Sequence, residues 1–98
     1  MICEIEQTQS FALWLSQLRD LRARLSIGRR IERLALGNPS DCKSVGGGIS
    51  ELRIDVSGGN RVYFTRRHNR LILLLVGGDK SSQAGDILKA RALAKELK

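Results

Sequence analysis

The sequence of 98 residues is poor in aromatic residues, cysteine, histidine and proline. Aromatic residues make up only 4%, so the core has to be built mainly from Leu, Ile, Val and Ala. No apolar run approaches the roughly 20 residues that span a bilayer, and no basic leader opens the chain, which predicts a cytoplasmic protein. Cys3 and Cys42 are too few and too far apart for a metal cluster, and His68 is the only histidine. We therefore expect no metal and no other cofactor.

Negative charge is also scarce. Lys and Arg total 17 against 10 Asp and Glu, which gives a net charge of +7. Most of the basic residues are Arg, whose guanidinium pairs bidentately with phosphate or carboxylate. The composition therefore predicts anionic partners, either nucleic acid or an acidic protein. The chain length and the ordinary globular composition predict a single domain over residues 1–98.

The hydrophobic pattern predicts an α+β fold with the order β-α-α-β-β-β-α. A short strand at residues 2–7 precedes two helices, the second of which covers residues 21–36 and ends at Gly37. Three antiparallel strands follow at residues 51–56, 61–65 and 71–76, and a terminal helix covers residues 82–97. We expect the helices to pack on the antiparallel sheet. Residues 46–48 are interpreted as a turn, and Gly77-Gly78 as a break that lets the backbone turn sharply.

The first two strands of this meander predict a hairpin with a defined register. Because Leu52 and Ile54 must share a face with Val62, the numbers of directly paired residues must sum to an even number. That register requires a loop of three or five residues, or a bulge, around residues 58–59.

The same register gathers polar side chains on the other face of the hairpin. Arg53, Arg61 and Tyr63 fall together there, and we expect this face to be exposed. Two guanidiniums can bind phosphate through paired donors, and a tyrosine ring can stack on a base. Lys43 and Lys80 are placed where they add positive charge at the rim.

A purely structural interpretation of these arginines stays open. Glu51 and Asp55 flank Arg53 in the sequence and can neutralise the arginines as cross-strand neighbours. Arg61 has no carboxylate beside it in the sequence, which favours a functional role for this residue.

The second predicted helix carries a basic face. At about 100° per residue, Arg22, Arg29 and Arg33 lie opposite the face that contains Ile27 and Leu34. Such a face is either a solvated helix surface or a binding surface for an anionic partner.

Three motifs follow one another along the predicted strands: Glu51-Leu52-Arg53-Ile54, Arg61-Val62-Tyr63-Phe64 and Leu74-Leu75-Val76-Gly77-Gly78-Asp79-Lys80. They resemble the addiction-module killer proteins, HigB-like toxins of the RelE/ParE superfamily. The resemblance implies the RelE/ParE-like fold and the toxin component of a type II toxin–antitoxin system. It also implies a cognate antitoxin, which we expect to be a helix-turn-helix protein. Operator DNA is expected to be contacted only by the antitoxin and not by this chain directly. The basic helix face of Arg22, Arg29 and Arg33 becomes the expected antitoxin-binding surface, and no membrane partner is expected.

The resemblance further implies a ribosome-dependent mRNA endoribonuclease that uses the 2′-hydroxyl of the RNA as nucleophile. Arg61 and Lys80 match the catalytic positions, with Arg53 as a neighbour, and the expected RNA-binding residues are Lys43, Tyr63 and Asp86. The chain departs from several nucleases of the family because its C-terminal segment contains no Tyr or His. Proton transfer would then fall to Lys43, Lys80, Asp86 or Tyr63. The alternative is a ParE-like toxin that binds a protein target such as DNA gyrase and cleaves no RNA.

Overall fold

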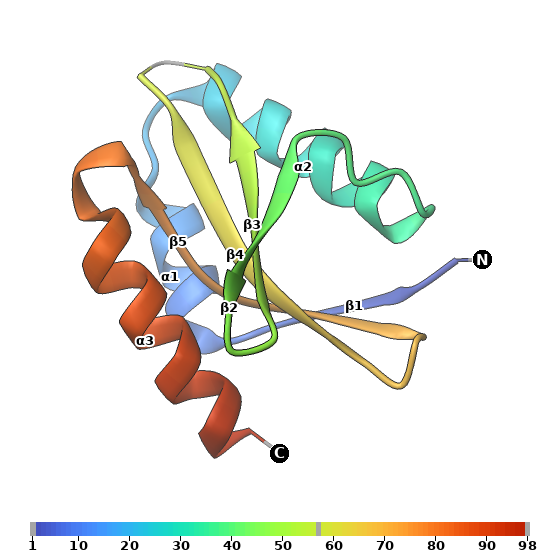
Figure 1. The fold of residues 1–98 in the computed structure, drawn as a ribbon. Helices are drawn as coiled ribbons and strands as arrows, with labels where there is room; N and C mark the ends of the chain where they lie inside the picture. The colour runs from blue at the N-terminus through green and yellow to red at the C-terminus, as the bar shows by residue number, and fades with distance from the viewer. Residues whose placement is uncertain (1, 57, 98) are drawn as a thin grey trace.

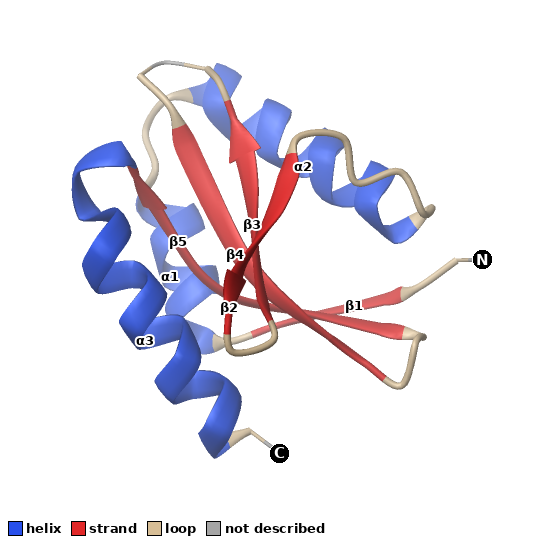
Figure 2. Ribbon diagram, in the orientation of Figure 1, coloured by secondary structure: helices blue, strands red, loops and turns tan. Residues whose placement is uncertain are grey.

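The computed structural model describes residues 2–56 and 58–97. A five-stranded sheet in the order β1-β5-β4-β3-β2 carries helices on both faces (Figures 1 and 2). The elements are β1 Glu4–Gln7, α1 Gln9–Gln17, α2 Leu21–Ala35, β2 Cys42–Gly46, β3 Ile49–Ile54, β4 Asn60–Arg67, β5 Leu71–Asp79, the 3-10 helix η1 Lys80–Ser82 and α3 Gln83–Glu96. The predicted α+β architecture is confirmed. None of the helices in these ranges is long and apolar enough to cross a membrane.

Two features of the sheet differ from the prediction. The segment Cys42–Gly46 forms an additional edge strand, β2, antiparallel to β3. The sequence does not predict this strand, because Val45 is its only residue with a strong strand preference. The sheet is also mixed rather than antiparallel, because β1 runs parallel to β5 with Glu4 opposite Leu71.

The β3–β4 hairpin has the predicted register. Leu52 pairs with Val62 and Arg53 with Arg61, so the paired residue numbers sum to an even number. Five residues connect Ile54 to its partner Asn60. Arg53 and Arg61 therefore project from the same face of the sheet, one position away from the apolar residues that face the opposite way.

The two faces of the sheet are covered by different helices. Helices α1 and α2 pack on one face, around a cluster that includes Phe11, Ile27, Leu52 and Phe64. Helix α3 crosses the other face, over β4 and β5, where Ala90 contributes to a second cluster (Figure 1). A register shift between β4 and β5 lets neighbouring residues of β5 face α3 together. Beside α3, Arg53 of β3 stays partly exposed, whereas Ile49 and Glu51 are buried.

The prediction that Gly77-Gly78 breaks the strand and turns the chain is wrong. Both glycines lie inside β5, opposite Val62 and Arg61. A Cβ atom on Gly77 would collide with the ring of Trp14 from α1, and one on Gly78 with the carboxylate of Asp86 from α3. Glycine is required here because helices on both faces approach the strand closely.

Candidate functional site

The carboxylate of Glu51 lies fully buried at the centre of a polar network between β3, β4 and α3. Its Oε1 accepts a hydrogen bond from Nε of Arg53 at 3.0 Å and lies 3.6 Å from Nε of Arg61. Its Oε2 accepts from Nε2 of Gln83 at 2.7 Å and from the hydroxyl of Tyr63 at 3.3 Å. The strand register explains this convergence, since Glu51 is opposite Tyr63 and Arg53 is opposite Arg61.

The network keeps Glu51 ionised. Burial opposes its charge, but the hydrogen bonds from Arg53 and Gln83 and the nearby charge of Arg61 outweigh burial and lower the pKa of the Glu51 carboxyl. The carboxylate of Glu51 is thus shared by two guanidiniums and does not neutralise both of them by itself. The structure accommodates both interpretations of the sequence, because Glu51 pairs with the arginines without neutralising them. The other candidate carboxylate, Asp55, is exposed and forms no ion pair with any residue in the described ranges.

The two arginines differ in exposure. The side chain of Arg53 is 41% exposed and that of Arg61 only 10%. Nε of Arg61 is buried and has no hydrogen-bond partner among the described residues. A buried donor without a partner is rare in folded proteins, and an anion placed against both guanidiniums would find them already oriented.

The expectation that this sheet face is exposed is wrong for Arg61, which is buried, and for Tyr63. The side chain of Tyr63 is fully buried in the cluster beneath α3. Burial, and then the charges of Glu51 and Asp86, raise the pKa of the Tyr63 phenol above its ordinary value. The ring cannot stack on a base without displacing α3, and its hydroxyl keeps its proton at neutral pH. Tyr63 therefore helps to hold the Glu51 carboxylate in place through the hydrogen bond from its hydroxyl.

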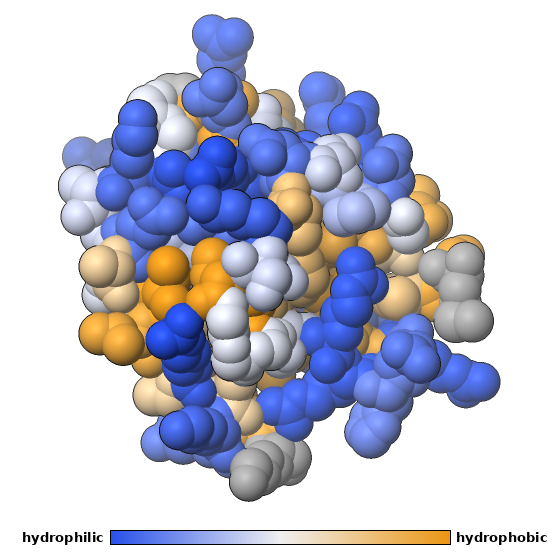
Figure 3. All heavy atoms as spheres, viewed as in Figure 1, coloured by the Kyte–Doolittle hydropathy of each residue, from blue (hydrophilic) through white to orange (hydrophobic). Residues whose placement is uncertain are grey.

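The remaining predicted site residues lie around this centre. Lys43 is exposed on β2, directly opposite Glu51. Asp86 is half-buried on α3, where its Oδ2 accepts from Oγ of Ser82 at 2.6 Å and packs against Gly78. Gly78 is the partner of Arg61 in the sheet, so Asp86 borders the arginine pair. Lys80 is exposed in η1. Figure 3 shows hydrophilic side chains gathered over β3 and β4, where the N-terminal end of α3 approaches them.

The basic face of α2 is exposed, as the sequence predicts. Arg29 and Arg33 line a groove of about 340 Å³ beside the β3–β4 loop, and Arg22 lies outside it. Arg30, which the sequence reasoning missed, links this groove to the site, since its Nη1 donates to the backbone carbonyl of Arg53 at 2.6 Å. Gln83 was missed as a site residue as well; its position at the start of the last helix gave no indication that it would contact Glu51.

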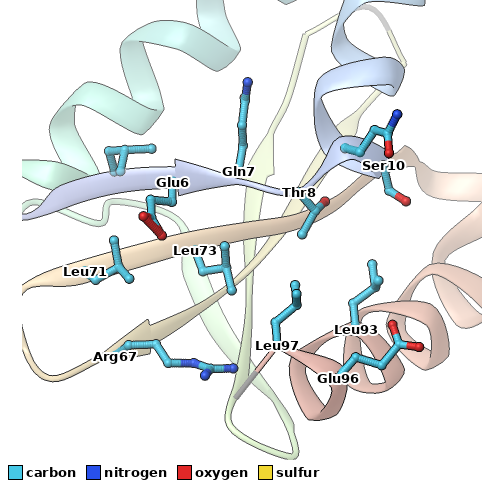
Figure 4. A pocket seen from close by; sticks show the side chains of 12 residues that line it. Glu6, Gln7, Thr8, Ser10, Arg67, Leu71, Leu73, Leu93, Glu96 and Leu97 are labelled. Atoms are coloured by element: carbon cyan, nitrogen blue, oxygen red, sulfur yellow. The ribbon is translucent and has the colours of Figure 1, made fainter.

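A larger groove lies elsewhere on the protein. It has a volume of about 1240 Å³ and runs between β1, β5 and the C-terminal end of α3 (Figure 4). Leu71, Leu73, Leu93 and Leu97 line it, and no predicted site residue does. Within residues 2–56 and 58–97, no three His, Cys, Asp or Glu side chains come together to hold a metal ion.

Comparison with known proteins places the chain in a family. The model of the phage-derived Gp49-like proteins (DUF891) matches residues 14–97. An uncharacterized protein of Haemophilus influenzae is 50% identical over 97 residues, which cover 99% of this chain and 98% of that protein. A mutant of the Escherichia coli toxin RelE, solved in the free state, matches with a TM-score of 0.78 over the whole of both chains. Its sequence identity is 11%, so this likeness concerns the fold. The chain belongs to the family of phage-derived Gp49-like proteins and has the fold of RelE.

Proposed function

We propose that this protein is the toxin of a type II toxin–antitoxin system, of the HigB-like kind, and that it cleaves mRNA on the ribosome in the cytoplasm. One observation carries the proposal: the single carboxylate of Glu51 holds the partly exposed Arg53 and the buried Arg61 together and is shared between them. The RelE fold and the resemblance of the three strand motifs to HigB-like toxins support the same function.

In the proposed reaction, the scissile phosphate binds at Arg61 and Arg53. The RNA 2′-hydroxyl attacks phosphorus, the bond to the 5′-oxygen breaks, and a 2′,3′-cyclic phosphate and a 5′-hydroxyl result. Negative charge grows on the phosphate oxygens during this step, and guanidiniums fixed in advance stabilise it best. Lys43 and Lys80 add positive charge around the phosphate.

Proton transfer needs a base and an acid. Asp86 is the proposed base for the 2′-hydroxyl, because its half-buried carboxylate borders the arginine pair. Glu51 is unsuited, since both of its oxygens accept hydrogen bonds within the network. Tyr63 is unsuited because its hydroxyl is buried and retains its proton. The proton for the leaving 5′-oxygen is assigned to the exposed ammonium of Lys43, which lies opposite Glu51, whereas Lys80 contributes charge only.

The decisive test compares two arginines of the same strand in a ribosome-dependent cleavage assay. Arg61→Ala should lower the cleavage rate about 10²–10³-fold, as the loss of a transition-state donor does. Arg66→Ala is the matched control, because Arg66 is exposed and projects from the opposite face of β4. Circular dichroism and thermal unfolding should show that both variants fold. A wild-type protein that arrests growth and inhibits gyrase supercoiling without cutting mRNA would overturn the nuclease in favour of a ParE-like toxin.

The antitoxin is proposed to bind the basic face of α2 through an acidic segment. Arg22, Arg29 and Arg33 are exposed there and form no ion pair within the described residues. Reversal of Arg29 and Arg33 to Glu should slow association, since opposite charges steer the encounter. Arg24→Glu is the control, because Arg24 lies on the other flank of the helix. Association rates that are the same for both variants and independent of salt would rule this surface out.

A further inference from the structure

We infer that a basic pocket between α3 and the sheet, remote from the arginine pair, binds the phosphate backbone of RNA beyond the cleaved bond. This inference rests on the proposed function, since it assigns a second contact to the same substrate. The pocket has a volume of about 620 Å³. Its lining residues are Gly47, Thr65, Arg67, Arg91, Ala94 and Lys95.

The charged residues that line the pocket, among those that the structure describes, are all basic. They are Arg67, Arg91 and Lys95. The three cations take part in no ion pair among residues 2–56 and 58–97. Like charges gathered in a concave surface repel one another and focus a positive potential in it. An anionic ligand relieves that repulsion.

The two guanidiniums of the pocket are held in place by backbone carbonyls. Nη2 of Arg67 donates to the carbonyl of Ala94 at 2.9 Å, and Nη2 of Arg91 donates to that of Val45 at 2.5 Å. The side chain of Arg91 also lies against Gly47, where a Cβ would come within 3.4 Å of it. A guanidinium that is anchored at one nitrogen loses less freedom when its other nitrogens bind an anion. The pocket is therefore organised before any ligand arrives.

The strand geometry relates this pocket to the candidate site. Arg61 and Arg67 both project from the α3 face of β4, because their positions in the strand differ by six, an even number. At about 3.3 Å per residue, their Cα atoms are roughly 20 Å apart along the strand. A single phosphate group cannot contact both places, whereas a single strand of RNA several nucleotides long can. The spacing thus favours a polynucleotide over a small phosphorylated ligand.

The test measures binding separately from cleavage. The probes are uncleavable 2′-O-methyl RNA oligonucleotides, one limited to a few nucleotides and one extended, followed by fluorescence anisotropy at several salt concentrations. The double variant Arg91→Ala/Lys95→Ala should bind the extended RNA about tenfold more weakly and the short RNA as the wild type does. Because this variant neutralises two phosphates fewer, the slope of log affinity against log salt should fall by roughly 1.4. Lys95→Glu, which breaks no hydrogen bond among the described residues, should act in the same direction.

Lys89→Ala is the matched control, since Lys89 is exposed on α3 and does not line the pocket. The inference is overturned if the pocket variants bind extended RNA like this control. It is also overturned if they lose affinity only for the antitoxin, because the pocket would then serve a protein partner. A wild-type protein that binds extended RNA through the pocket but never cleaves mRNA would refute the nuclease while leaving the pocket in place.

Discussion

The two faces of the sheet differ in what they bury, although the same strands build both. On the face covered by α1 and α2, the described buried residues carry no charge and include Phe11, Leu52 and Phe64. On the face covered by α3, the ionised Glu51 and the guanidinium of Arg61 are buried next to apolar residues. Neighbouring residues of β3 thus serve different purposes, with Leu52 in the core and Glu51 in the candidate site. Strand alternation lets one face stabilise the fold while the other carries charge.

Buried charge on the α3 face has an energetic consequence. Desolvation of an ion pair offsets most of its Coulomb attraction, so the network adds little net stability, whereas removal of one partner leaves an uncompensated charge. On the α1–α2 face, substitutions that remove side-chain volume should therefore lower the free energy of unfolding most. On the α3 face, substitutions that remove a charge should lower it most.

The largest change in stability is expected from Leu52→Ala. Leu52 is fully buried, so its truncation leaves a cavity and should lower the free energy of unfolding by about 2–5 kcal/mol. Urea unfolding followed by circular dichroism measures this loss. Cleavage per folded molecule should remain close to wild type, because the substitution leaves the charges of the opposite face intact. A loss below about 1 kcal/mol would contradict the division between the faces.

Glu51→Gln preserves shape and removes charge. It should lower the free energy of unfolding at pH 7 by about 1–3 kcal/mol, since hydrogen bonds to a charged group are lost and the arginines repel each other. Asp55→Asn is the control because Asp55 is exposed. If both variants unfold like the wild type, Glu51 does not organise the arginines.

The pH dependence of stability also separates the wild type from Glu51→Gln. The pKa of Glu51 is lower in the folded protein than its ordinary value of 4.5, so its stabilising contribution is complete above that value. The contribution is lost progressively as pH falls from about 4.5 through the folded pKa. Wild-type stability should therefore decline more steeply in this window than that of Glu51→Gln. Equal slopes in urea unfolding series would contradict the lowered pKa.

A smaller effect is expected from Tyr63→Phe. The substitution removes one hydrogen bond to Glu51 and keeps the buried ring, which should lower the free energy of unfolding by about 1 kcal/mol. The cleavage rate should be nearly unchanged, because the hydroxyl is proposed to exchange no proton with RNA. Cleavage that is about 10²-fold slower at wild-type stability would show instead that Tyr63 takes part in proton transfer.

The smallest effect is expected from Lys80→Arg. This change keeps the positive charge of an exposed residue, so single-turnover cleavage should stay close to the wild-type rate. An arginine cannot readily give up a proton, so a drop of about 10²-fold or more would identify Lys80 as the acid that protonates the leaving oxygen.

The sequence predicted the hairpin register because residue alternation is a local property. Because the numbers of paired residues must sum to an even number, Arg53 and Arg61 are predicted to share a face of the sheet. The structure confirms this. Alternation does not reveal what covers a face, and for that reason Tyr63 was expected to be exposed. Its burial depends on α3, which begins twenty residues later in the chain.

The errors at Gly77-Gly78 and β2 have related causes. Glycine pairs are typical of turns, and only the tertiary approach of Trp14 and Asp86 explains why a strand needs them. The segment Cys42–Gly46 has little intrinsic strand preference and becomes a strand because β3 offers it hydrogen-bonding partners.

The late position of α3 in the chain bears on protein synthesis. Gln83, which completes the shell of hydrogen bonds around Glu51, is translated 32 residues after it. The strand β1, translated among the first residues, likewise has to wait for β5 before it can pair. A ribosome in the course of making this protein therefore carries a chain without its finished arginine pair. The candidate site is therefore complete only after the last helix has been synthesised and has packed on the sheet.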